Sequence, residues 1–343
     1  MKTMIRSMFK GAGRYPWYNS FFGVPLIDLG VGGTPALRGI FTPEPEIGAE
    51  KIGISDQFLA NAEDYHQRYS GSEHMKDVLE QAFTHAGVSM ASSPDVLDIG
   101  TGSGTNSLLP MLSLFDHARF VATDLSPDLL VILRRYVERE SLSDRVACVC
   151  TDAMNSFFAP ARFDMVTGVS LLHHLIDPAA AIKAAHAALK KGGVAVFCDP
   201  FEGYGMIGLT FRLILDRATR EGLDLNPEAA DFMRAMIIDF DARRGTDKSD
   251  VRFRYMDDKW LFTREYLEDV ACDAGFASVS ILPHANNETY FRDYTTVLFR
   301  LGRDLKPDAL PDWAWDTIDL IDRSFSPEMK SALLMEGSII LKK

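Results

Sequence analysis

The stretch VLDIGTGSGTNSLLP, residues 96–110, has glycines at three alternate positions directly after a short apolar run that contains one acid. The glycines are Gly100, Gly102 and Gly104, and the acid is Asp98. Glycine adopts backbone conformations closed to other residues and lets a ligand approach the main chain closely. In an open α/β sheet, ligands bind where the first strand turns into its helix, against the amides at the helix start. We therefore predict a ligand-binding turn here.

The spacing of the glycines argues against a dinucleotide ligand. The dinucleotide fingerprint G-x-G-x-x-G needs a glycine where this chain has Thr105. The pattern is instead D-x-G-x-G-x-G. Pro110 lies inside the helix expected after the turn, where proline would bend the axis or shift the helix start downstream.

Strands and helices alternate through the middle of the chain, because short apolar runs alternate with amphipathic segments. The expected strands are 95–99, 119–123, 145–150, 164–169, 194–198, 278–282 and 295–300. The helices between the first five strands are expected at 104–115, 127–140 and 178–190. This alternation predicts an α/β fold with a seven-stranded, mainly parallel sheet and helices on both faces.

We expect three parts in the chain. Residues 1–90 form an irregular arm followed by cap helices that begin near Ser55 and Ser72. Residues 91–300 form the sheet domain, with a helical insertion over about 204–258 above the carboxyl edge of the sheet. Residues 301–343 form a C-terminal extension, whose closing GSIILKK is a candidate strand.

Composition narrows the class of partner. The 343 residues carry a net charge of −12, which disfavours nucleic acid and anionic membranes. No run reaches the roughly 18 apolar residues of a membrane span. The four cysteines contain no C-x-x-C pair and fit a reducing compartment. We expect a cytoplasmic protein with a small-molecule partner and neither nucleic acid nor membrane; the tail with Trp313 and Trp315 is a candidate homodimer contact.

Five motifs in order resemble those of the class I, Rossmann-like S-adenosylmethionine-dependent methyltransferases. They are the glycine turn, FVATDLS, CTDAM, FDMVTGVSLLHHL with AALKKGGVAVFCDP, and EDVACDAGFASVSILP. The resemblance covers roughly residues 56–300. It implies a Rossmann-like methyltransferase sheet, S-adenosyl-L-methionine as cofactor and S-adenosyl-L-homocysteine as product.

The resemblance also implies residue roles. Asp124 would accept hydrogen bonds from both ribose hydroxyls, while Asp152 and Ala153 would bind the adenine amino group and ring edge. The expected cofactor-binding residues are Asp98, Gly100, Thr101, Gly102, Gly104, Asp124, Leu125, Asp152, Ala153, Ser170 and Tyr69.

Methyl transfer from a sulfonium is an in-line displacement in which the protein mainly aligns the reactants and excludes water. The candidate catalytic residues are His173, His174, Asp199 and Tyr65. A histidine base is useful only if the acceptor is a hydroxyl or an amine. Successive residues at a helix start point about 100° apart, so we expect at most one of the two histidines to face the substrate. Their alternative role is to order the loop beside the cofactor.

Two further arrangements stay open. A thioether acceptor would give a sulfonium product, which an aromatic cage can stabilise. The candidate cage residues are Tyr15, Trp17, Tyr18, Phe21 and Phe22, although packing under a loop is the preferred interpretation. His173, His174 and His284 with an acid could form a metal site. Adjacent histidines seldom bind one ion, so we expect no metal.

The sequence therefore favours a methyltransferase that acts on a small-molecule metabolite, with the acceptor atom (O, N, S or C) open; a thioether and a hydroxy or keto acid are among the candidates. The alternatives are a protein or nucleic-acid methyltransferase, or a non-catalytic adenosylmethionine-binding protein. Enzymes that methylate planar amide or adenine nitrogens usually carry an Asn/Asp-Pro-Pro-Tyr motif after the fourth strand. This chain has GVSL at 168–171 instead.

Overall fold

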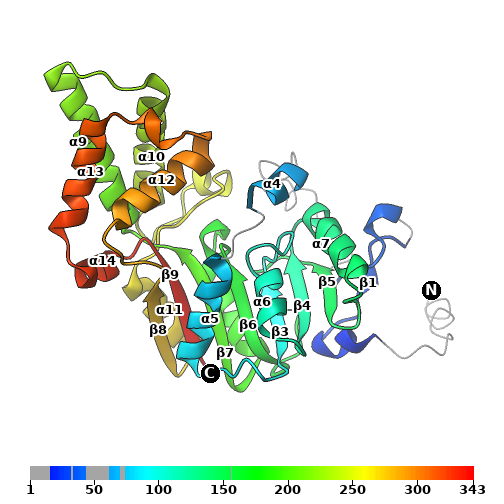
Figure 1. The fold of residues 1–343 in the computed structure, drawn as a ribbon. Coiled ribbons are helices and arrows are strands. Elements are labelled where there is room, and N and C mark those ends of the chain that lie inside the picture. The colour runs from blue at the N-terminus through cyan, green and yellow to red at the C-terminus, as the bar shows by residue number, and fades with distance from the viewer. Residues whose placement is uncertain (1–15, 32–33, 44–61, 70–73, 156) are drawn as a thin grey trace.

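The computed structural model describes residues 16–31, 34–43, 62–69, 74–155 and 157–343, with Tyr65, Arg68 and Tyr69 described by backbone alone (Figure 1). The strands are β1 (Ile27–Asp28), β2 (Ile40–Thr42), β3 (Asp95–Ile99), β4 (Arg119–Asp124), β5 (Val146–Cys150), β6 (Phe163–Val169), β7 (Leu189–Pro200), β8 (Ser278–Pro283) and β9 (Glu336–Lys342). The α-helices are α4 (Ala62–Tyr69), α5 (His74–Ala86), α6 (Leu108–Leu114), α7 (Pro127–Arg139), α8 (Pro178–Ala188), α9 (Tyr204–Glu221), α10 (Pro227–Arg243), α11 (Arg264–Ala274), α12 (Tyr290–Arg303), α13 (Asp312–Ser324) and α14 (Pro327–Leu333). Short 3₁₀ helices are η1 (Trp17–Phe21), η2 (Pro35–Leu37), η3 (Leu172–His174), η4 (Val251–Arg254) and η5 (Pro307–Ala309).

The described strands form one sheet in the order β1-β2-β5-β4-β3-β6-β7-β9-β8. The pairs β1–β2, β7–β9 and β9–β8 are antiparallel, and the other neighbouring pairs are parallel. This confirms the α/β fold, although the sheet has nine strands where we expected seven. The closing segment is β9, inserted between β7 and β8, and the N-terminal region adds β1 and β2.

The strand expected over 295–300 is wrong, because this segment belongs to helix α12. Its β-branched and aromatic residues favour a strand locally. The buried residues of the helix, however, include Phe291, Thr295 and Phe299, which recur every four positions along one face. That face packs into an apolar cluster with α9, α10 and α13, so tertiary contacts override the local preference.

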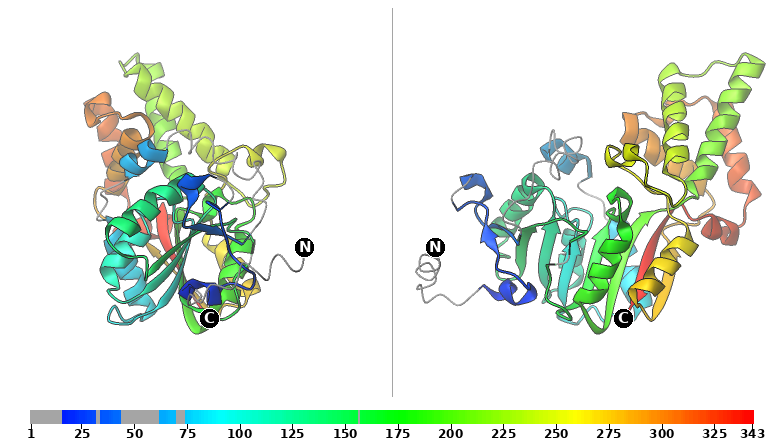
Figure 2. Two further views of the ribbon diagram at one scale, coloured as in Figure 1. Left: turned by 90° about the vertical axis from the view of Figure 1, so that its right-hand side faces the viewer. Right: turned by 180° about the vertical axis from the view of Figure 1, so that it is seen from behind.

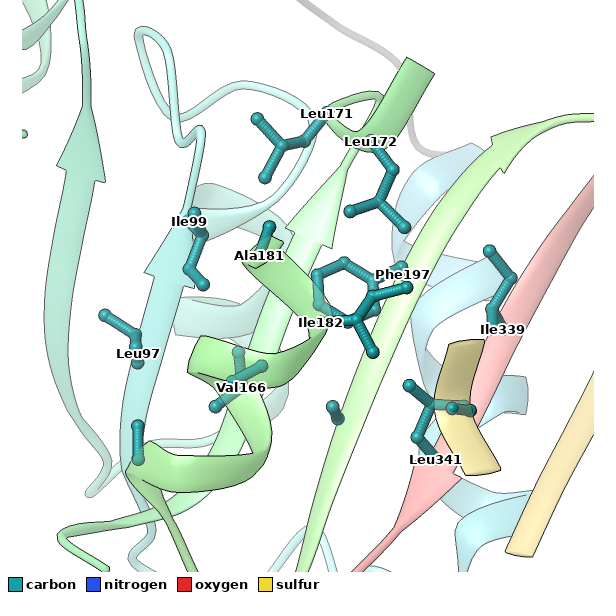
Figure 3. Close-up of a cluster of buried hydrophobic side chains, with 14 of the residues drawn as sticks. Leu97, Ile99, Val166, Leu171, Leu172, Ala181, Ile182, Phe197, Ile339 and Leu341 are labelled. Atoms are coloured by element: carbon teal, nitrogen blue, oxygen red, sulfur yellow. The ribbon is translucent and has the colours of Figure 1, made fainter. Parts of the chain in front are cut away.

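Helices cover both faces of the sheet, as expected. α5, α6 and α7 pack on one face. α8 and α11 pack on the other, where Ile182 and Ala181 lie over Phe197 and Val166 (Figure 3). α7 begins where expected, because the Ser126 hydroxyl accepts the Leu129 amide at 3.1 Å and proline occupies the first helical position. α8 is capped in the same way by Asp177.

The helix after the glycine turn starts later than the predicted 104–115. It begins at Leu108, so Pro110 lies in its first turn. Amides of a first turn have no partner inside the helix, so proline costs no hydrogen bond there. The residues from Gly100 to Ser107 are thereby left as an extended turn above the sheet.

A second helical group stands beyond the sheet's carboxyl edge. α9 and α10 come from the expected insertion, and α12 and α13 come from the chain after β8. These four helices share an apolar cluster of their own that includes Phe211, Phe232 and Phe299. They extend away from the end of the sheet that carries β1 (Figures 1 and 2). The helical layer is therefore larger than the segment 204–258 alone.

The described aromatic residues of the N-terminal arm pack against the sheet and do not line the cavity at the glycine turn. Phe21 stacks on Phe163, the first residue of β6, with ring centroids 4.8 Å apart. Trp17 lies under the guanidinium of Arg119, the first residue of β4. Both contacts lie at the amino edge of the parallel strands, opposite the glycine turn, and Tyr15 is outside the described residues.

The structure also bears on the expected dimer contact at Trp313 and Trp315 and on the expected lack of a membrane span. Trp315 is buried in the helical group, where its Nε1 donates to the Pro307 carbonyl at 2.9 Å, so its ring is unavailable for a dimer contact. A homodimer stays a prediction. In the part of the chain that the structure describes, no helix combines the length and the apolar character that crossing a membrane would require.

Candidate active site

The turn after β3 depends on its glycines. Gly100, Gly102 and Gly104 have φ angles of 69°, 55° and 87°, in the left-handed region that favours glycine. A Cβ on Gly100 would also lie 2.6 Å from Leu171 Cδ1. The backbone of the turn therefore needs residues without side chains.

Asp98 supports the turn from below and does not line the cavity. It is fully buried and accepts hydrogen bonds from the hydroxyls of Ser107 at 2.7 Å and Thr167 at 2.8 Å. These bonds join the end of β3 to the start of α6 and to β6. Burial raises the pKa of Asp98 to about 6, against the hydroxyl hydrogen bonds that lower it.

Asp124 fixes the same turn from the neighbouring strand. Its Oδ2 accepts the Gly102 amide at 2.7 Å, and its Oδ1 accepts the Ser126 amide at 2.8 Å. A carboxylate oxygen accepts more than one hydrogen bond, so both oxygens keep capacity for ligand hydroxyls. One strand further, Asp152 accepts the Met154 amide at 2.9 Å, which sets the position of its carboxylate.

A cavity of about 510 Å³ lies over these turns. It extends from the loops after β4 and β5, past the glycine turn, to the loop after β6 and the segment after η4. Of the expected cofactor residues, those that line it are Gly100, Thr101, Gly102, Asp124, Leu125, Asp152, Ala153 and Ser170. Asp98 and Gly104 lie outside the lining. Tyr69 is in α4, but its side chain is outside the described part of the structure.

The hydrogen-bond acceptors that line this cavity fit an adenosyl cofactor. Nucleoside hydroxyl and amino groups are hydrogen-bond donors, and the carboxylates of Asp124 and Asp152 are acceptors that face the cavity. Leu125 and Leu129 provide apolar lining on the same side. If that cofactor is S-adenosyl-L-methionine, it supplies an activated methyl carbon on a sulfonium when bound.

Of the expected catalytic residues, His174 lines the cavity, whereas His173 and Asp199 lie behind the lining. Asp199 Oδ1 lies 2.7 Å from His173 Nδ1 and also accepts the His173 amide at 3.0 Å. The other ring nitrogen of His173 faces Asp258 Oδ1 at 3.4 Å. Tyr65 is in α4, and its side chain is outside the described part.

The two adjacent histidines differ in charge, because the pKa of His173 is raised and that of His174 is lowered. Burial opposes a charged His173, but Asp258 and Asp199 outweigh burial and raise the pKa of His173 to about 9. Burial, together with the positive charge of His173, lowers the pKa of His174 to about 3. The ring centroids lie only 4.0 Å apart, so one imidazolium excludes the other. His174 therefore meets the cavity as a neutral imidazole.

Sequence reasoning missed a second set of residues around this pair. Asp258 binds Arg243 of α10 through its Oδ2 at 3.1 Å, and Arg243 Nη1 also binds Asp239 Oδ2 at 3.0 Å. Lys259 and Arg254 line the cavity. They come from a stretch without a recognisable motif, and only its high charge density could have drawn attention to it.

The structure brings together three atoms that could bind a metal ion, from His173, His174 and Asp258, all within 4.8 Å of one another. His284, the expected alternative ligand, lies elsewhere, with its Nε2 3.1 Å from Ser338 Oγ. Two cations, the His173 imidazolium and Arg243, face the carboxylates of Asp199, Asp258 and Asp239 in this cluster. The absence of a metal stays a prediction.

Comparison with known proteins supports this picture. A family model described as a methyltransferase domain matches residues 96–193. The release factor glutamine methyltransferase of Chlorobaculum tepidum is 39% identical over 87 residues, which are 24% of this chain and 29% of that protein. The ubiquinone biosynthesis O-methyltransferase of Idiomarina loihiensis is 32% identical over 102 residues, 30% of this chain and 40% of that protein. The chain thus spans less than half the length of these relatives.

The fold is also shared with a solved structure, phosphoethanolamine N-methyltransferase 2 of Haemonchus contortus bound to S-adenosyl-L-methionine. The TM-score is 0.52 at 18% identity, with 88% of this chain and 61% of that chain covered. Residues 96–193 are therefore a methyltransferase domain, and the chain has the fold of the class I S-adenosylmethionine-dependent methyltransferases.

Proposed function

We propose that the protein transfers the methyl group of S-adenosyl-L-methionine to a small-molecule acceptor. The observation that carries this proposal is the single continuous cavity that joins Asp124 and Asp152 to His174 and Lys259. The end of the cavity near Asp124 and Asp152 fits an adenosyl group. The end near His174 and Lys259 leaves space for an acceptor. A volume of about 510 Å³ suits a cofactor with a compact second molecule better than a polymer.

The reaction needs little from the protein beyond alignment. A lone pair of the acceptor attacks the methyl carbon, and the carbon–sulfur bond electrons return to sulfur, which loses its positive charge. A hydroxyl acceptor also loses its proton as the new bond forms, and an ammonium loses one before the attack, which exposes the nitrogen lone pair. We propose that neutral His174 accepts a hydrogen bond from such an acceptor, while His173 and Asp199 hold the loop in place as positioning residues.

A protein or nucleic-acid acceptor is the second candidate. The relative from Chlorobaculum tepidum, a release factor glutamine methyltransferase, favours it. Two features disfavour a protein or nucleic-acid acceptor: the stretch GVSL at 168–171, which spans the end of β6, and the cavity wall to which Arg254, Asp257 and Lys259 contribute. The ubiquinone biosynthesis O-methyltransferases among the relatives act in small-molecule metabolism, as their name states.

The test combines binding with product identification. Calorimetry should detect S-adenosyl-L-methionine and S-adenosyl-L-homocysteine at one site per chain. Incubation with methyl-labelled S-adenosyl-L-methionine and fractionated cell extract should place the label in a small molecule, identified by mass. Label in protein or nucleic acid would favour the second candidate. Tight cofactor binding without transfer to any fraction would indicate a non-catalytic cofactor-binding protein.

A further inference from the structure

Lys259 is a buried cation on the wall of the cavity. Its residue is 3% exposed, and its Nζ donates to the carbonyls of Met256 at 2.6 Å and Asp257 at 3.2 Å. Among the residues that the structure describes, no carboxylate oxygen lies within 4.0 Å of this ammonium. Burying a charge is costly unless an opposite charge compensates it. Burial lowers the pKa of Lys259, whereas the carboxylates of Asp257 and Asp258, beyond 4.0 Å, raise it only in part, so an anion in direct contact would stabilise the ammonium.

A second cation faces the same part of the cavity. Arg254, at the end of η4, lines it and is likewise without a carboxylate within 4.0 Å in the described chain. Arg252 in the same short helix differs, because its guanidinium lies 3.6 Å from Asp250 and it does not line the cavity. With Asp257, which also lines the cavity, the two cations leave this wall with a net positive charge.

The position of these cations separates them from the adenosyl half. Asp124 ends β4 and Asp152 follows β5, whereas β6 lies on the other side of β3 in the sheet. The backbone N–H of Lys259 donates to the His173 carbonyl at 2.7 Å, which anchors the segment over the loop after β6. The cations thus lie on the β6 side of the cavity, away from Asp124 and Asp152, where the proposed acceptor would bind.

We propose that the acceptor carries an anionic group, a carboxylate or a phosphate, which Lys259 and Arg254 bind. This inference rests on the proposed methyltransferase function. Guanidinium groups bind such planar or tetrahedral anions through paired hydrogen bonds, and an ammonium adds a point charge. The competing source of the same chemistry is the carboxylate of the cofactor's own methionine moiety, and the experiment below separates the two.

The first measurement uses inorganic phosphate as the probe. Protein saturated with S-adenosyl-L-homocysteine is titrated with millimolar phosphate at constant ionic strength, and binding is followed by the rise in melting temperature. Arg254→Gln should weaken phosphate binding about fivefold or more, as loss of a charge-assisted hydrogen bond requires. Arg252→Gln is the matched control, since it removes the same charge from the same helix, and should leave phosphate affinity unchanged.

The second measurement separates acceptor from cofactor. Calorimetry compares S-adenosyl-L-homocysteine with 5′-methylthioadenosine, which lacks the carboxylate, in wild type and in Lys259→Met. If Lys259→Met binds S-adenosyl-L-homocysteine and 5′-methylthioadenosine with the same affinities as wild type, the proposal is supported. A selective loss of S-adenosyl-L-homocysteine affinity would assign Lys259 to the cofactor and overturn it. Because Lys259→Met can fail to fold, Arg254→Gln, an exposed position, is measured in the same way.

The outcomes distinguish this inference from the proposed function. If wild type binds S-adenosyl-L-homocysteine but not phosphate, or if Arg254→Gln binds phosphate as wild type does, the anionic acceptor is wrong and the methyltransferase proposal stands. If wild type binds no S-adenosyl-L-homocysteine, the proposed function itself fails.

Discussion

His173 and Asp199 are joined at two points, because one carboxylate oxygen lies 2.7 Å from the ring Nδ1 and 3.0 Å from the backbone nitrogen of the same histidine. Asp258 faces the opposite side of the ring. An imidazole held between two carboxylates, of which Asp199 is buried and Asp258 partly exposed, takes up a proton, and that charge keeps the neighbouring His174 neutral. The pair of histidines therefore divides its roles: one orders the loop and the other meets the cavity.

The stability of the protein should fall as pH rises through the pKa of His173 in the folded state. The pKa of His173 is about 9 in the folded state against 6.5 as its ordinary value, so the folded state binds more protons between these pH values. The stabilisation is complete below pH 6.5 and is lost as pH rises through about 9, amounting to on the order of 3 kcal/mol. Urea unfolding from pH 6 to 10 measures it.

His173→Gln should flatten this pH profile, and the difference from wild type isolates the contribution of His173. The comparison is needed because the pKa of His284 is also raised, to about 10, where neighbouring Cys198 and Glu336 outweigh its burial. His284→Gln is the control and should leave the decline near pH 9 in place. An equal decline in wild type and His173→Gln would show that His173 is not charged in the folded protein.

His174→Ala should lower turnover with little effect on cofactor affinity. His174 lines the cavity at its acceptor end, and loss of a positioned proton acceptor costs about a hundredfold or more where proton transfer limits the reaction. A neutral imidazole whose pKa is about 3 is a weak base, so we expect a smaller loss, about tenfold. The measurement is the rate with the identified acceptor, alongside calorimetry of S-adenosyl-L-homocysteine. Wild-type turnover would remove His174 from the mechanism.

Asp124→Ala should weaken S-adenosyl-L-methionine binding at least about tenfold, since a hydrogen bond to a charged group contributes roughly 1.5–3 kcal/mol. Asp124→Asn keeps one acceptor oxygen and should lose less. Asp128→Ala, an exposed carboxylate in the first turn of α7, is the matched control and should bind normally. Calorimetry that showed equal affinity in all three variants would contradict a cofactor role for Asp124.

Gly203→Ala should strongly destabilise the junction between β7 and the helical group. A Cβ at Gly203 would lie 1.7 Å from the backbone oxygen of Leu333, which cannot move without shifting the chain that leads into β9. We expect a loss of about 3 kcal/mol or more in the free energy of unfolding. At Gly205, two residues further in α9, the nearest atom is the flexible Arg244 Nη2 at 3.2 Å. Gly205→Ala should therefore be neutral or stabilising by up to about 1 kcal/mol; equal losses would disprove the steric argument.

Local patterns were sufficient for the parallel core and for most of the residues that line the candidate cofactor half of the cavity. The glycine turn, Asp124 and Asp152 follow three strands whose apolar runs are unmistakable, and the ends of parallel strands meet at one edge. The same approach failed at 295–300, where a strand-like composition belongs to helix α12, because packing against three other helices decides the conformation there. It also left the start of α6 uncertain, which the position of Pro110 explains.

The sequence by itself determined that this chain folds as a Rossmann-like sheet with a glycine turn after its first parallel strand, because those features depend on local periodicity and on glycine spacing. The adenosyl cofactor was implied by the resemblance to the class I methyltransferases. Only the tertiary structure decided which histidine meets the cavity and which charges surround it. Asp258 and Lys259 lie more than 80 residues beyond His173 in the chain. They contact His173 because the chain returns to the loop after β6 once the helical insertion ends. Contacts between residues so far apart in the chain depend on how the helices pack, and no local pattern encodes them.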